Sequence, residues 1–162
     1  MTMKVWQILK SLENLEDGMA RFYDTLRAHY TSDAEIAGFF ARMRDEELSH
    51  RDIVRYQQRI MFKCPENYMD LKDYDQGAID QAMRTVEDLI NREGDLSLNE
   101  ALRSAVALEA AATEQHYRSV VGLASPALGK LVQHLGSCDE THAARLGTFV
   151  RSHGENPSRW TS

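Results

Sequence analysis

Four segments of this chain of 162 residues carry apolar side chains at alternating steps of three and four residues. Such steps return to the same face of an α-helix, whereas in a β-strand every second side chain returns to the same face. The first segment has the stripe Val5, Ile8, Leu12, Leu15, Met19, Phe22 and Leu26. We therefore expect a long amphipathic helix over about residues 3–30.

The second stripe predicts a helix over about residues 33–60 and contains an anomaly. Ser32 followed by Glu35 is a capping-box pattern, which makes Ser32 the expected N-cap. The stripe reads Ile36, Phe40, Met43, Glu47, His50, Val54 and Gln57. Two ionisable side chains and an amide thus occupy positions on the face that should pack against the core, where a polar group needs a partner.

Three more helices are expected in the rest of the chain. A short one over about residues 77–92 is followed by Gly94 as a stop signal. A second capping box, Ser97 with Glu100, begins a helix over about residues 98–123, and Ser125 with Pro126 begins the last one. The stripes of these two long helices consist of Leu98, Leu102, Ala105, Glu109, Ala112, His116 and Val120, and of Leu128, Leu131, Leu135, Asp139, His142, Leu146 and Phe149.

The lengths of the connections predict how the helices are arranged. Short turns join the first two long helices and the last two, which makes each pair antiparallel neighbours. The connection over about residues 61–97 is long enough to run the length of a bundle. We expect an all-α fold: a four-helix bundle of two antiparallel hairpins joined by a long crossover, which is similar to the ferritin-like arrangement. It would form one domain over about residues 1–154, followed by a polar tail over residues 155–162.

Composition and charge narrow the classes of function. The net charge of −6 argues against a nucleic-acid-binding protein, which needs a basic surface. No apolar run approaches the roughly 18 residues of a membrane span, and the N-terminal stretch does not resemble a signal peptide. We therefore expect a cytoplasmic protein with neither membrane nor nucleic acid as partner. The two cysteines, Cys64 and Cys138, form no CxxC motif, which excludes a thiolate metal site of the rubredoxin kind within the chain.

The polar residues on the stripes repeat in the two hairpins. Each hairpin has an acid on its first helix, Glu16 or Glu109, and an acid-x-x-His pair on its second. Residues three apart share a face of a helix, so each pair points the same way. Four carboxylates and two imidazoles at one level would be costly to bury unless cations neutralise them. The pattern predicts a dinuclear site for iron, manganese or zinc, with a solvated polar layer as the alternative. The predicted ligands are Glu16, Glu47, His50, Glu109, Asp139 and His142.

The ordered set of motifs resembles the rubrerythrin branch of the ferritin-like superfamily. The stretches that carry the resemblance are LEDGMARFYDTL, RDEELSHRDI, ALEAAATEQHY and CDETHAARL. The resemblance implies that Glu16 and Glu109 are terminal carboxylates, that Glu47 and Asp139 bridge two metals, and that His50 and His142 each bind one metal. It further implies a hydrogen bond from Tyr23 to a ligand carboxylate, with Tyr117 as a looser match.

Two departures from the family pattern bear on the activity. Asp139 stands where the family has Glu and is one methylene shorter, so Glu140 is an alternative fourth carboxylate. The extra Glu of peroxide-reducing rubrerythrins is replaced by Ala112, and the rubredoxin iron site is missing from the chain.

We expect a diiron oxidoreductase acting on dioxygen or peroxide, in iron handling or oxidative-stress defence, with an external electron donor. A non-catalytic metal-binding or assembly module with a degenerate site is the alternative. The resemblance also suggests a homodimer, with Trp6 and Phe62 as candidate contacts.

Overall fold

Helices dominate the structure, a computed structural model that describes residues 2–67, 71–72, 76–92, 94–112 and 137–154. These residues form five α-helices: α1 (Val5–His29), α2 (Ala34–Lys63), α3 (Gln76–Asn91), α4 (Leu98–Ala112) and α7 (Ser137–His153). A 3-10 turn, Pro65–Asn67, follows α2, and two-residue strands β1 (Thr2–Met3) and β2 (Leu71–Lys72) pair antiparallel. The all-α expectation is therefore confirmed. Among the described helices, none combines the length and apolar character that crossing a membrane requires.

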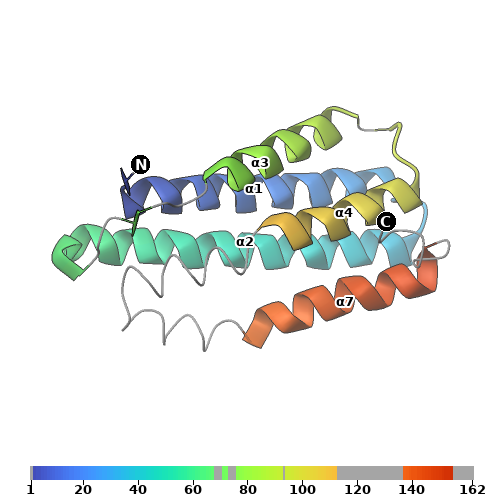
Figure 1. Ribbon diagram of the computed structural model, residues 1–162. Coiled ribbons are helices and arrows are strands. Elements are labelled where there is room, and N and C mark those ends of the chain that lie inside the picture. Colours follow the sequence, from blue (N-terminus) through green and yellow to red (C-terminus); the bar gives the residue numbers. More distant parts are fainter. Residues whose placement is uncertain (1, 68–70, 73–75, 93, 113–136, 155–162) are drawn as a thin grey trace.

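The long helices α1 and α2 lie side by side and antiparallel (Figure 1). All seven residues of the predicted stripe on α1 are buried. The prediction of Ser32 as N-cap of α2 is wrong by one residue, because Asp33 takes that place. One carboxylate oxygen of Asp33 accepts hydrogen bonds from the backbone amides of Glu35 and Ile36, at 3.0 and 3.1 Å. Either side chain can cap a helix, and the charged one also interacts favourably with the helix dipole.

A ladder of ion pairs runs along the outer face of the α1–α2 hairpin. Three acids of α1 pair with three arginines of α2: Glu13 with Arg55 (2.8 Å), Asp17 with Arg51 (3.0 Å) and Asp24 with Arg44 (3.0 Å). Steps of four and then seven residues along α1 are matched by equal steps back along α2. The ladder thus shows that α1 and α2 keep one antiparallel register along this face. Each exposed ion pair contributes at most about 1 kcal/mol to the stability of the fold.

Helix α3 covers the side of α1 that faces away from α2 (Figure 1). Gly18 of α1 permits a close approach, since a Cβ atom at this position would lie 3.2 Å from Cγ1 of Val86. The predicted Gly stop is confirmed: Gly94 follows the end of α3 with φ +91°, in the region that favours glycine. The predicted loop over residues 61–76 differs in that α2 continues to Lys63 and β2 pairs with the N-terminal strand.

Helix α7 packs against α2, and α4 lies beside the α1–α2 hairpin (Figure 1). The Ser97–Glu100 capping box at the start of α4 is confirmed: the Ser97 amide donates to the Glu100 carboxylate at 3.0 Å, and the Glu100 amide donates to the Ser97 hydroxyl at 3.3 Å. The rings of Phe39 on α2 and Phe149 on α7 stack with centroids 3.7 Å apart. The described part of α4 ends at Ala112, so the predicted continuation to residue 123 and the start at Pro126 lie outside the described residues.

Candidate metal centre

Two buried acids and a half-buried histidine meet in the core between α1 and α2. Glu16 and Glu47 are only 7 and 2% exposed, although both are ionisable. Glu47 follows Met43 on the apolar stripe of α2, and His50 lies one turn further along the same face. Gln57 continues this polar interruption and is 2% exposed. The prediction that the polar stripe residues of α2 face the core is therefore confirmed.

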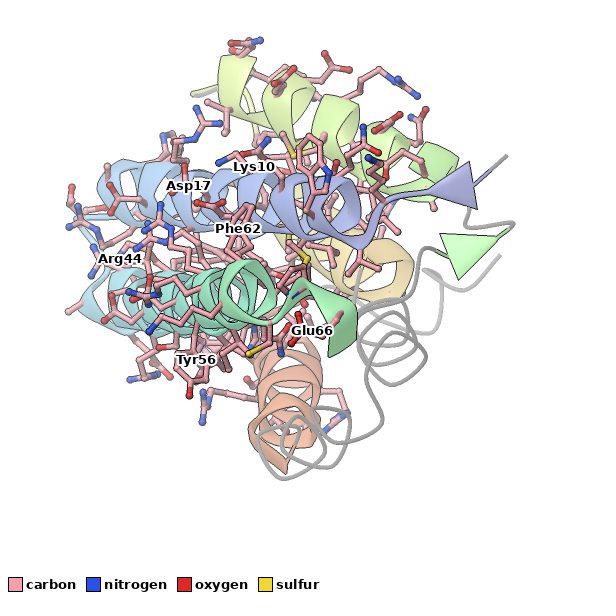
Figure 2. The ribbon with its side chains drawn as sticks, turned by 90° about the vertical axis from the view of Figure 1, so that its left-hand side faces the viewer. Lys10, Asp17, Arg44, Tyr56, Phe62 and Glu66 are labelled. Carbon is pink, nitrogen blue, oxygen red and sulfur yellow. The ribbon has the colours of Figure 1, made fainter. Side chains whose placement is uncertain are left out.

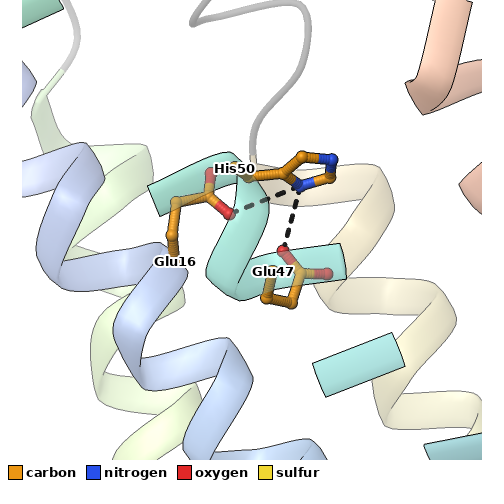
Figure 3. A group of neighbouring side chains, drawn as sticks. All are labelled: Glu16, Glu47 and His50. Carbon is orange, nitrogen blue, oxygen red and sulfur yellow. Dashed lines mark hydrogen bonds and ion pairs between the residues drawn. The ribbon is translucent and has the colours of Figure 1, made fainter. Parts of the chain in front are cut away.

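The ring of His50 joins the two carboxylates (Figure 3). Its Nδ1 atom lies 3.2 Å from Oε2 of Glu47 and 3.7 Å from Oε2 of Glu16. One potential ligand atom from each of the three residues lies within 4.8 Å of the others. Carboxylate oxygen and imidazole nitrogen together suit iron, manganese or zinc. The donor set is thus the one that the sequence predicts for the first hairpin.

A fourth predicted residue, Glu109 of α4, is directed toward the same region by a tyrosine. The hydroxyl of Tyr23, which is fully buried on α1, donates a hydrogen bond of 2.7 Å to Oε1 of Glu109. This contact connects residues on two helices that are distant in sequence. The predicted hydrogen bond from Tyr23 to one of the proposed ligand carboxylates is therefore confirmed.

The electrostatics of the cluster reflect three acids in one apolar region. Burial raises the pKa of the Glu47 carboxyl well above its usual range; the charge of Glu109 adds to this, the hydrogen bond with His50 opposes it, and Glu16 adds further. Burial also raises the pKa of the Tyr23 hydroxyl, and the charges of Glu109 and Glu47 follow as the next causes. The charge of Glu109 thus acts on both side chains, although Glu109 is not one of the three residues whose ligand atoms lie within 4.8 Å of one another.

The second hairpin's ligand pair is described only in its backbone. Asp139 and His142 lie in α7, as does the alternative acid Glu140, but the described side chains of α7 begin at residue 144. Tyr117 lies outside the described residues. The structure therefore brings together Glu16, Glu47, His50 and, through Tyr23, Glu109. It leaves the positions of the other predicted side chains as predictions.

One charged residue beside the cluster is not predicted by the sequence. Glu46 belongs to the acidic run RDEE, whose residues other than Glu47 are expected to be exposed to solvent. In the structure, Glu46 forms an ion pair with Arg145 of α7. The pair links α2 to α7 next to Glu47. No sequence signal singles it out, because a charged residue on a helix surface is common and its partner is about a hundred residues away.

Comparison of the chain with protein-family models, with curated proteins and with solved structures finds no match. The resemblance to the rubrerythrin branch therefore remains one of motifs and their order. The chemistry of the cluster itself is the basis on which a function can be proposed.

Proposed function

We propose that this chain binds two metal ions, iron in the first place, within a ferritin-like four-helix bundle, and that it acts as an oxidoreductase toward dioxygen or peroxide. The observation that carries the proposal is the cluster of Glu16, Glu47 and His50, whose ligand atoms lie within 4.8 Å of one another in the core. Exposed acidic groups often lie close together without binding a metal. A buried group of ionisable side chains is a stronger candidate for a functional site.

The residues present fit a divalent cation. Glu16 and Glu47 are withdrawn from water, and the charge of Glu109 acts on the same place. Buried like charges cost several kcal/mol each unless protons or cations neutralise them. A cation bound by these carboxylates and by His50 would relieve that repulsion, and the apolar residues around it would keep bulk water away.

The antiparallel register of α7 against α2 supports a second set of ligands, contributed by α7. Phe149 and Arg145 of α7 contact Phe39 and Glu46 of α2, respectively, so α7 runs antiparallel to α2. Moving along α2 from Glu46 toward His50 thus corresponds to moving along α7 from Arg145 toward its N-terminus. His142 and Asp139 are the residues one and two turns in that direction. Their backbone positions agree with a site shared by both hairpins.

The order of the helices supports the ferritin-like part of the proposal. The chain passes from Lys63 at the end of α2 to Leu98 at the start of α4 through a 3-10 turn, a strand and α3. A long connection between two helix pairs distinguishes this bundle from one with only short loops. The rubrerythrin-like motif order gives the same topology.

In the proposed centre, each residue has a defined task. Glu16, Glu47, His50 and Glu109 hold the metal, and Tyr23 fixes the orientation of Glu109 through its hydrogen bond. Ferrous ions bound there would supply electrons for the reduction of dioxygen or peroxide. The side chain of His50 is the most accessible of the three, at 19% exposed against 10% for Glu16 and 2% for Glu47.

A non-catalytic metal-binding module is the second candidate. Asp139, one methylene shorter than Glu, and Ala112, in place of an additional acid, both reduce the number or the reach of the carboxylates that the rubrerythrin pattern provides. In that case metal binding would stabilise the fold or serve assembly, and the rate of iron oxidation would be that of free iron.

Ferrous iron titrated anaerobically and then exposed to air distinguishes the candidates. We expect two ions per chain and oxidation faster than in buffer, with both lost in Glu47→Ala and His50→Ala. Asp45→Asn, an exposed acid on the same helix, is the matched control and should behave as wild type. Tight binding without faster oxidation supports the module, and no binding overturns the proposal.

A further inference from the structure

Exposed aromatic side chains gather at one end of the α1–α2 hairpin. Among the described residues, Trp6, Tyr56 and Phe62 are large apolar side chains that are 45, 50 and 70% exposed. Continuing the ion-pair register by seven residues beyond Glu13 and Arg55 reaches Trp6 and Phe62, which therefore lie at the same level of the hairpin. Figure 2 views the molecule from this end and labels Tyr56 and Phe62 on α2. Apolar side chains that gather on one surface mark interaction sites more often than singly exposed ones do.

Two cations lie between these aromatics. Arg59 and Lys63 are exposed, and neither forms an ion pair with any residue that the structure describes. Arg44, Arg51 and Arg55 of the same helix are all paired with acids of α1. The end of α2 thus presents two exposed cations that pair with no described acid, on a chain whose net charge is −6.

The surface is also hollowed. An open hollow of about 600 Å³ is lined by Tyr56, Arg59, Ile60, Phe62 and Lys63. Aromatic residues and arginine are the types most enriched among the residues that dominate binding energy at protein interfaces. A hollow of this size accommodates a protruding side chain of a partner, with the two cations among its lining residues.

We propose that this end patch, formed by Trp6, Tyr56, Arg59, Ile60, Phe62 and Lys63, is a docking surface for an acidic segment of a partner protein that inserts an apolar side chain between the aromatics. The charge of the patch selects carboxylates, and the hollow selects an apolar anchor. The site is separate from the metal cluster, because Lys63 lies about 20 Å along α2 from His50 at 1.5 Å per residue.

Two other occupants fit the observations less well. A second copy related by a two-fold axis would set this patch against itself, and the patch contains no carboxylate to pair with Arg59 and Lys63. Attraction to an anionic membrane contributes about 1 kcal/mol for each basic residue near its surface. Two cations on a chain of net charge −6 are too few to give stable binding by this attraction. A flat bilayer would also leave the hollow unfilled.

Selection of random peptides displayed on phage against the full chain tests the proposal while the partner is unidentified. We expect a consensus of Asp or Glu flanking a large apolar residue. Affinity of a synthetic consensus peptide, read by fluorescence anisotropy, should fall by about tenfold or more in Tyr56→Ser/Phe62→Ser, in line with interface hot spots. It should fall in Arg59→Ser/Lys63→Ser and with added salt, because both weaken attraction between charges.

Matched controls lie elsewhere on the surface. Val106→Ser removes another exposed apolar side chain, and Arg42→Ser removes another exposed cation of α2; both should leave peptide binding unchanged. Circular dichroism verifies that all variants are folded, as expected for exposed positions. The proposal is overturned if no consensus emerges, if the consensus lacks acids, or if the patch variants bind as wild type. It is equally overturned if the patch instead mediates self-association in sedimentation velocity or binding to phosphatidylserine vesicles.

Discussion

The hydroxyl of Tyr23 on α1 and the carboxylate of Glu109 on α4 form a hydrogen bond of 2.7 Å inside the core. The bond connects the α1–α2 hairpin to the second half of the chain at the level of Glu16 and Glu47, whose charges both act on Tyr23. A carboxylate that is held by a fixed donor has one preferred orientation. The proposed metal centre depends on this convergence of acids from different helices.

Replacing Tyr23 by Phe tests whether the hydrogen bond orients a ligand. We expect a loss of about 1–2 kcal/mol in the free energy of unfolding. We also expect metal affinity to fall by about tenfold or more, as is usual for residues that support a ligand. Urea denaturation and competition with a fluorescent chelator measure the two quantities. Tyr30→Phe is the control, since its hydroxyl donates to the backbone oxygen of Leu96 at 3.2 Å; it should lose stability only.

Replacing Glu47 by Gln should have opposite effects on the metal-free and the metal-bound protein. Burial and the charges of Glu109 and Glu16 raise the pKa of Glu47, so keeping this acid in the core costs free energy that an uncharged amide avoids. The metal-free variant should therefore be at least as stable as wild type, by up to about 1 kcal/mol. Stabilisation by added Mn²⁺ or Fe²⁺ should disappear, because a ligand is lost. Thermal unfolding with and without metal checks both. A metal-free variant that is strongly destabilised would mean that Glu47 has a structural role.

Replacing Glu13 by Gln tests the pH dependence of the ion-pair ladder. The carboxylate of Glu13 accepts hydrogen bonds from three side chains, those of Arg55, Lys10 and Gln58. Burial raises the pKa of Glu13, but these bonds outweigh burial and lower it from 4.5 to about 2. A lowered pKa stabilises the fold at pH values above 4.5, and this stabilisation is lost as the pH falls from 4.5 toward 2.

At neutral pH the Glu13→Gln variant should therefore be less stable by about 1–2 kcal/mol, a value discounted for the exposure of the partner cations. The difference from wild type should shrink steadily below pH 4.5. Urea denaturation over a pH series measures it. Glu87→Gln, an exposed acid on α3, provides the comparison and should show little effect at any pH. A Glu13→Gln difference that is constant with pH would contradict the assignment.

Replacing Gly18 by Ala tests the close packing of α3 on α1. The new Cβ atom would lie 3.2 Å from Cγ1 of Val86, closer than ordinary van der Waals contact. We expect a loss of about 1–2 kcal/mol, since overpacking outweighs the better helix propensity of Ala. Gly38→Ala on α2 has no atom within 4 Å and should instead stabilise by about 0.5–1 kcal/mol. Chemical denaturation compares the two; equal effects would mean that Val86 moves aside without cost.

The helices and their inward faces follow from patterns that are local in sequence. The stripe of α1, the Ser97–Glu100 capping box and the stop at Gly94 are all predictable, because each depends on residues a few positions apart. The use of Asp33 rather than Ser32 as the N-cap of α2 is not predictable in this way, because two adjacent residues can both cap the helix. The β1–β2 pair is too short for an alternating pattern to appear in the sequence.

Contacts between distant helices are harder to predict. The periodicity shows that Glu47 and His50 face inward, but only the resemblance suggests that Tyr23 contacts a carboxylate. The ion pair of Glu46 with Arg145 depends on how α7 is rotated against α2, which no local pattern determines. Whether Asp139 and His142 face this cluster depends on the same rotation and stays a prediction.

The most direct measurement is the anomalous diffraction of a crystal grown with excess Fe²⁺ under anaerobic conditions. We predict two strong peaks, one within coordinating distance of Glu16, Glu47 and His50, and a second bounded by Glu109 and the side chains of Asp139 and His142. Absence of anomalous density at the Glu16–Glu47–His50 cluster in such a crystal, with those side chains still in contact with one another, would contradict the proposed metal centre.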